Sequence, residues 1–90
     1  MYNYSKLPVG LQDGMQRYIE HGIIPGHFLT AVLENNLFSA VMRADVNNLK
    51  ELPNIVRWMH WEIPSAAHGS EVTVKAWIDK FKPVEERRYA

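Results

Sequence analysis

The segment HGIIPGHF places two histidines, His21 and His27, where metal or phosphate chemistry could be sought. Metal ligands on one helix are three or four residues apart, whereas these two imidazoles are six apart across a proline. A phosphate-binding loop needs several converging backbone N–H groups, and Pro25 lacks one. A second pair, His60 and His68, matches no common metal-site spacing. We therefore expect no metal and no cofactor, and we interpret HGIIPGHF as a bend between two helices.

The side chains that could act as nucleophiles or acid–base groups do not form a catalytic pattern. The chain has no cysteine, so a thiol nucleophile is excluded. No serine follows the nucleophile-elbow pattern, and Ser70 is better explained as a helix cap. The neighbouring carboxylates Glu85 and Glu86 lie in a charged tail that we expect to be frayed. The residues thus predict a protein that is not an enzyme.

The composition limits the classes of partner. Ninety residues suffice for one domain, and ten basic against ten acidic side chains give a net charge of zero. A nucleic-acid binder usually carries a positive excess. The stretch GHFLTAVLENNLFSAVMRAD resembles a helix-turn-helix in spacing, but its second helix offers only Ser39 and Arg43 to a base edge. We therefore expect no nucleic-acid partner, and without a long apolar run or signal pattern we expect no membrane partner.

Apolar residues recur at helical spacing in segments that end at glycine, asparagine, aspartate or proline. Asn36, Asp45 and Ser70 are expected to cap the helices that follow them, and Gly22 to stop the first one. Pro53 either kinks the longest helix or marks its start. The expected helices cover residues 7–22, 25–33, 37–44, 46–63 and 71–81. The fold class is therefore all-α, a single-domain bundle of five short helices over residues 1–90, with flexible ends at 1–7 and 82–90.

Each of these helices carries an apolar stripe, which in an amphipathic helix faces the core, and two of these stripes follow a particularly regular spacing. The stripe of the third helix repeats the spacing of the second. The stripe of the longest helix advances by three and four residues along one face. The residues of the two stripes are Leu37, Phe38, Val41 and Met42, and then Leu49, Leu52, Val56, Met59 and Ile63.

The stretch NIVRWMHWE is the strongest candidate for a binding surface. If Met59 faces the core, a rotation of about 100° per residue turns Arg57 and Trp61 nearly the opposite way, with Trp58 beside them. Tryptophan and arginine are enriched in interface hot spots. The alternative is that Trp58 packs under the first or last helix, with Trp61 covered by the SAAHG loop. The sequence leaves both interpretations open.

The HGIIPGH connector is a second candidate surface. Ile23 and Ile24, followed by His27, would form an apolar loop tip, and loop tips on a scaffold often bind partners. The alternative is that both isoleucines plug the bundle.

The segments RYIEHGIIPGHFLTAVLENNL and IVRWMHWEIP resemble a family of small tailed-phage and prophage proteins with the patterns RYIEHGIPPGxFLxAVLxNDL and IVxWLYNEAP. The likeness covers about residues 8–78. The chain departs from the pattern at Asn35–Asn36, where the family often has Asn-Asp, and at His60–Trp61, where Tyr-Asn is usual. The family has no established activity, so no catalytic residues carry over. The resemblance implies a phage origin and the host bacterial cytoplasm.

These observations together predict a non-enzymatic, phage-encoded binding protein that docks on a host protein in host takeover or counter-defence. Arg57, Trp58 and Trp61 are the expected contacts, and Ile23, Ile24 and His27 form the second candidate surface. Two alternatives remain: a small nucleic-acid-associated regulator, and a self-assembling accessory protein that forms a homo-oligomer.

Overall fold

Helices make up all the regular secondary structure of residues 2–82, which are the residues that the computed structural model describes. This confirms the expected all-α class. The elements in chain order are the 3-10 turn η1 (Tyr4–Lys6), α1 (Val9–His21), α2 (His27–Leu33), α3 (Leu37–Arg43), α4 (Val46–Glu62), the 3-10 turn η2 (Ser65–Ala67) and α5 (Glu71–Asp79).

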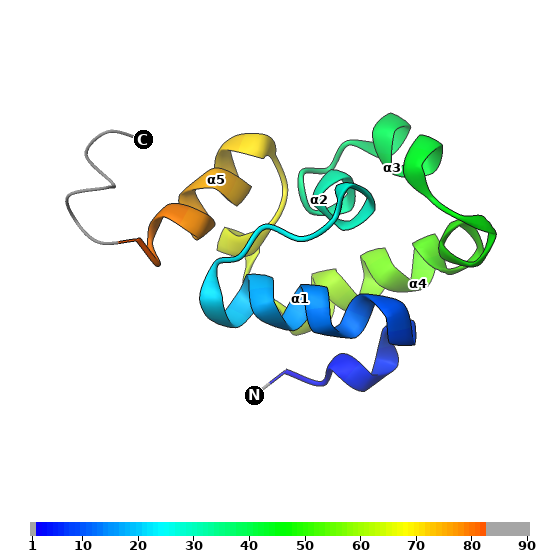
Figure 1. The fold of residues 1–90 in the computed structure, drawn as a ribbon, viewed down its shortest axis with the longest axis horizontal. Coiled ribbons are helices and arrows are strands. Elements are labelled where there is room, and N and C mark those ends of the chain that lie inside the picture. The colour runs from blue at the N-terminus through cyan, green and yellow to red at the C-terminus, as the bar shows by residue number, and fades with distance from the viewer. Residues whose placement is uncertain (1, 83–90) are drawn as a thin grey trace.

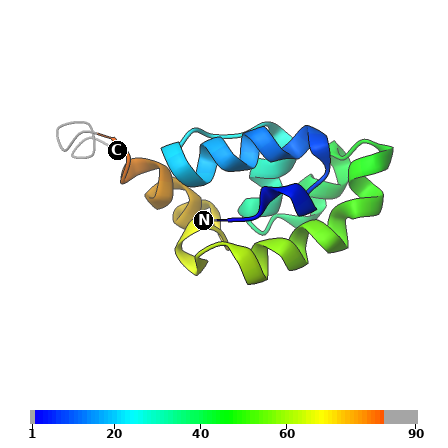
Figure 2. The same cartoon turned by 90° about the horizontal axis from the view of Figure 1, so that it is seen from below.

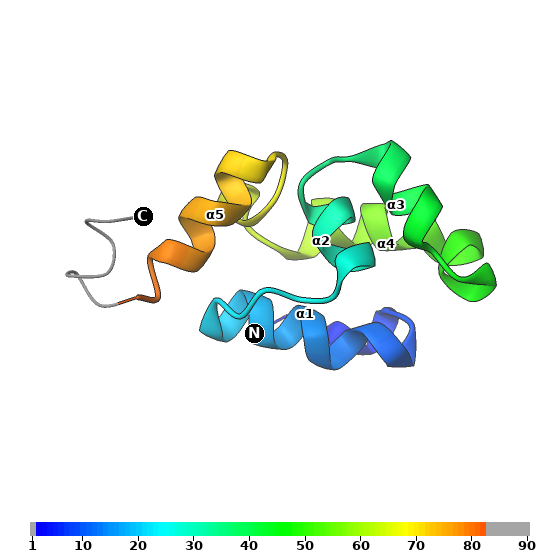
Figure 3. The same cartoon turned by 45° about the horizontal axis from the view of Figure 1, so that its top comes forward.

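The two longest helices, α1 and α4, run side by side along the length of the molecule (Figures 1 and 2). The short α2 lies between α3 and α5 (Figure 3). α3 sits at one end of the long axis and α5 at the other (Figure 1). The main contact of α3 is with α2, whereas α5 packs against the η2 turn. α3 and α5 therefore lie at opposite ends of the molecule, with α2 between them.

The expected caps define the helix starts. Asn36 and Asp45 each accept a hydrogen bond from the backbone N–H three residues on, at 3.1 and 2.7 Å, and Ser70 does the same at 3.0 Å. Gly22 ends α1 in the left-handed region, at φ 67°, and its N–H donates to the Tyr18 carbonyl. The side chains of Asn36, Asp45 and Ser70 thus each accept a backbone N–H that the first turn of a helix leaves without a partner.

The helix ends lie within two residues of the sequence-based expectation, and the question left open at Pro53 is resolved. α2 begins at His27, two residues later than expected, because Gly26 in extended backbone is its N-cap. α4 runs unbroken from Val46 to Glu62 with Pro53 inside it. Pro53 removes one backbone donor from the helix, so tertiary packing must offset that loss.

The core is a single apolar cluster with Tyr18 at its centre. Tyr18 is fully buried, and its hydroxyl donates to the Ala67 carbonyl at 2.6 Å. The Tyr18 carbonyl in turn accepts the indole N–H of Trp77 at 3.1 Å. One residue of α1 thus joins η2 and α5. Other large members of the cluster are Met15, Ile19, Phe28, Leu29, Leu33, Ile55, Met59, Ile63 and Val74.

Residues 2–7, part of the end that the sequence predicts to be flexible, pack on the core and on α4. Leu7 is buried, and the Tyr4 ring lies 5.7 Å from the ring of Trp58. The Trp58 indole N–H also donates to the Asn3 carbonyl at 2.8 Å. The segment is held because it covers an aromatic side chain of α4. Of the expected C-terminal end, residues 83–90 lie outside the described part of the chain.

The expected apolar stripes of α3 and α4 are only partly buried. On α3 the buried residue is Ala40, while Leu37, Phe38, Val41 and Met42 are exposed. On α4 the buried residues are Ile55, Trp58 and Met59, while Leu49 and Val56 are exposed. On α4 the buried face is shifted from the expected stripe toward Ile55 and Trp58, and Trp58 is covered by residues 3–4. α3 buries only its small residue Ala40, and its main contact is with α2.

Replacing Tyr18 with phenylalanine tests its central role. Tyr18→Phe keeps the ring but leaves the buried Ala67 carbonyl without a donor. We expect the free energy of unfolding to fall by about 1–3 kcal/mol. Denaturant unfolding measures it, with Tyr2→Phe as the control, since Tyr2 is half-buried and its hydroxyl is not part of the core. Equal stability of both variants and the wild type would contradict the assignment.

Candidate functional site

A shallow groove of about 320 Å³ lies between η1 and α4, and we call it the tryptophan groove. Trp61 stands at its edge, with 78% of its surface exposed. Its ring meets the His60 ring edge-on, with centroids 4.7 Å apart. The groove is lined by Lys6, Glu51, Asn54, Arg57, Trp58, Trp61 and Glu62.

The structure separates the two tryptophans that the sequence placed on one face. Trp58 is only 6% exposed and its indole N–H is bonded to Asn3, so the expectation of an outward-facing Trp58 is wrong. Trp61 is not covered by the loop after α4, so that part of the alternative is also wrong. Trp58 forms the inner wall of the groove and Trp61 its exposed rim.

Helical spacing brings the rim residues together. Asn54, Arg57 and Trp61 follow one another at intervals of three and four residues on α4, which places them on one face. Arg57 is exposed beside Trp61. The predicted pairing of Arg57 with Trp61 is therefore found in the structure, on the wall of a concave surface that the sequence did not indicate.

The HGIIPGH connector is exposed at its tip. Ile23 and Ile24 are each about half exposed, and His27 is exposed at the start of α2. The alternative in which both isoleucines plug the bundle is therefore wrong. The bend depends on Gly22, since a Cβ there would lie 2.5 Å from the Phe81 ring. No residue of the connector lines the tryptophan groove, so the two predicted surfaces are separate.

A third surface was missed at the sequence level. We call it the α3–α4 apolar face, and it consists of Leu37, Phe38, Val41, Met42, Leu49 and Val56, all exposed. A groove next to it is lined by Val32, Ala40 and Leu52 among others. The signal that could have shown it is the width of the apolar arc on α3. Positions 37, 38, 41 and 42 span about 140° at 100° per residue, more than one neighbouring helix covers.

The titratable groups with displaced pKa values serve the fold. Burial raises the pKa of Tyr18, whose hydroxyl is bonded to a backbone carbonyl. Burial and the hydrogen bond to Glu20 raise the pKa of Tyr4. Burial lowers the pKa of His68, and the neighbouring His60 lowers it further. Among residues 2–82, no three histidine, aspartate or glutamate side chains are grouped to hold a metal ion.

Comparisons with known proteins add no relative. No family model matches the chain, and neither a curated protein nor a solved structure matches it. Within residues 2–82, no helix has the length and apolar character needed to cross a membrane.

The lowered pKa of His68 predicts a pH-dependent stability. The unfolded chain, with an imidazole pKa of about 6.5, binds a proton at higher pH than the folded chain does. Stability is therefore expected to fall as the pH drops below that value. Denaturant unfolding at several pH values should show a smaller acid loss for His68→Gln than for the wild type.

The matched control is His27→Gln, which removes an exposed imidazole outside the His60–His68 pair. If His68→Gln and the wild type lose the same stability between neutral and mildly acidic pH, the burial of His68 does not affect folding as described.

Proposed function

We propose that this chain is a non-enzymatic binding protein that docks on another protein through the tryptophan groove. One observation carries the proposal: the large Trp61 side chain is 78% exposed beside Arg57. Tryptophan and arginine dominate the binding energy of many interfaces, because both bury a large area and keep a polar group for hydrogen bonding. Since α4 is a helix of 17 residues, both side chains start from a fixed backbone.

The charges around the groove favour a protein partner over nucleic acid. Lys6 and Arg57 contribute positive charge, whereas Glu51 and Glu62 contribute negative charge. A phosphate backbone would meet repulsion from both carboxylates. A protein surface can present charges of both signs, which gives such a mixed rim its specificity.

The resemblance to small phage proteins supports a host protein as the partner. A phage protein without catalytic groups can act by occupying a surface of a host protein in the bacterial cytoplasm. Host takeover or counter-defence is therefore the role we propose. The exposed Ile23, Ile24 and His27 of the connector offer a second contact region for the same partner.

The substitution Trp61→Ala tests the proposal. Because the indole is exposed, the free energy of unfolding should change by no more than about 0.5 kcal/mol. Capture of the partner from a bacterial host lysate, followed by mass spectrometry, should fall by at least about tenfold, as expected for a hot-spot residue.

Val72→Ala is the matched control, since Val72 is equally exposed but lies on α5, outside the tryptophan groove. Val72→Ala should capture the partner as the wild type does. Full capture by Trp61→Ala would contradict the assigned site, and unfolding of this variant would show that Trp61 belongs to the core.

A further inference from the structure

The α3–α4 apolar face is larger than a monomer of this size needs to expose. Phe38 and Met42 have 80% and 70% of their surfaces exposed. The six residues of the face together present on the order of 700 Å², whereas monomers rarely expose more than a few hundred. Each partner of a standard interface contributes about 800 Å². The area is therefore close to that of a specific interface.

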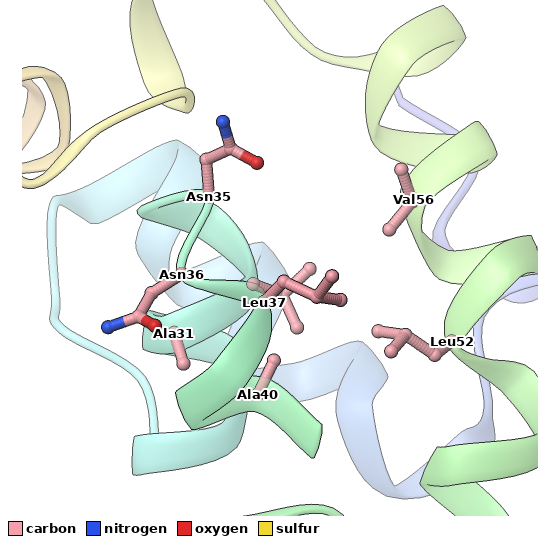
Figure 4. Close-up of a pocket in the computed structure, with 8 residues that line it drawn as sticks. Ala31, Asn35, Asn36, Leu37, Ala40, Leu52 and Val56 are labelled. Atoms are coloured by element: carbon pink, nitrogen blue, oxygen red, sulfur yellow. The ribbon is translucent and has the colours of Figure 1, made fainter. Parts of the chain in front are cut away.

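The exposed side chains of α3, among them Phe38 and Met42, form a ridge, and a groove lies beside it. Figure 4 shows Leu37 reaching from α3 toward Leu52 and Val56 on α4; Ala31 and Ala40 also line this groove. The groove continues past Val56 into a second hollow that ends at His60 and His68. It exists because α3 packs chiefly on α2 and does not close onto α4.

The groove and the ridge match in length. Along α4 the groove extends from Leu52 to His60, about 12 Å at the rise of an α-helix. The seven residues of α3 span about 10 Å by the same rise. The row of exposed α3 side chains is thus about as long as the groove beside it.

We propose that the α3–α4 apolar face binds a second copy of this chain in a two-fold symmetric dimer, with Phe38 of each copy packed against the α3–α4 face of the other. A two-fold interface sets the same patch against itself, so a charged patch would repel its copy. None of the six residues of the face is ionisable, and none that lines the groove between Leu37 and Leu52; His60 and His68 stand only at its far end. Because the ridge and the groove lie side by side, a two-fold axis can set the ridge of each copy against the groove of the other.

The charged residues after Lys82 do not suit this groove. Their sequence includes Glu85, Glu86, Arg87 and Arg88, and an apolar groove offers these charges no partner. Lys82 itself follows α5, at the opposite end of the long axis from α3 (Figure 1). A second copy is therefore the occupant that the face fits.

The dimer leaves the tryptophan groove open. Val56 and Trp61 are five residues apart on α4, which turns them about 140° from each other around the helix axis. The proposal is thus independent of docking on another protein. Trp61→Ala should leave the dimer intact, so failure of one proposal does not affect the other.

Light scattering of the full chain across concentrations measures the mass directly. We expect a dimer with a dissociation constant on the order of micromolar for an interface of this size. Phe38→Glu places a charge in the interface twice and should raise that constant by more than about tenfold. Val72→Glu, an equally exposed site on α5, is the matched control and should remain dimeric.

A cross-linking variant tests the geometry. The chain has no cysteine, so Val41→Cys introduces a single thiol beside the proposed symmetry axis. A short bis-maleimide should link two copies of Val41→Cys and should leave Val72→Cys unlinked.

Three results would overturn the dimer. These are a wild type that stays monomeric up to about 500 µM, a folded Phe38→Glu that stays dimeric, and a dimer whose Val41→Cys variant does not cross-link. If Phe38→Glu loses its helical circular dichroism, the mass of Met42→Lys, on the same ridge, is measured in its place, and a folded Met42→Lys that stays dimeric overturns the dimer. The first of these results includes a monomer that binds an amphipathic helix of another protein.

Discussion

The structure depends on the buried side chain and backbone of Tyr18. Its hydroxyl satisfies the Ala67 carbonyl of η2, and its own carbonyl satisfies the Trp77 indole of α5. A buried carbonyl without a donor is costly, so these two bonds determine how the segments after α4 return to α1. The Tyr18 and Trp77 rings also pack at 6.5 Å, which adds apolar area to the same junction. α3 takes no part in this junction and is held through α2.

The three tryptophans show how this core separates structural from exposed aromatic surface. Trp58 and Trp77 are buried, and each donates its indole N–H to a backbone carbonyl. Trp61 is exposed and has its ring against His60. An apolar ring that the fold does not cover is available to a partner, which is why we propose Trp61 as a docking residue. The same reasoning applies to Phe38 on α3.

Local chemistry made much of the fold predictable, and tertiary contacts decided the rest. The caps at Asn36, Asp45 and Ser70 act over three residues, so the sequence shows them directly. The exposed pair of Arg57 and Trp61 followed from helical spacing. Periodicity groups residues on one face but does not show which of two apolar faces is covered. For this reason the burial of Trp58 under residues 3–4 was not predictable, whereas the wide apolar arc of α3 indicated that part of it would stay exposed.

Iodide quenching of tryptophan fluorescence tests most directly the central claim that the core closes without Trp61. Of the three tryptophans, one should be accessible to iodide. The substitution Trp61→Phe should remove that accessible emission and leave the protected emission of Trp58 and Trp77. If quenchable emission persists in Trp61→Phe, or if all three tryptophans of the wild type are protected, the division between core and docking surface is wrong.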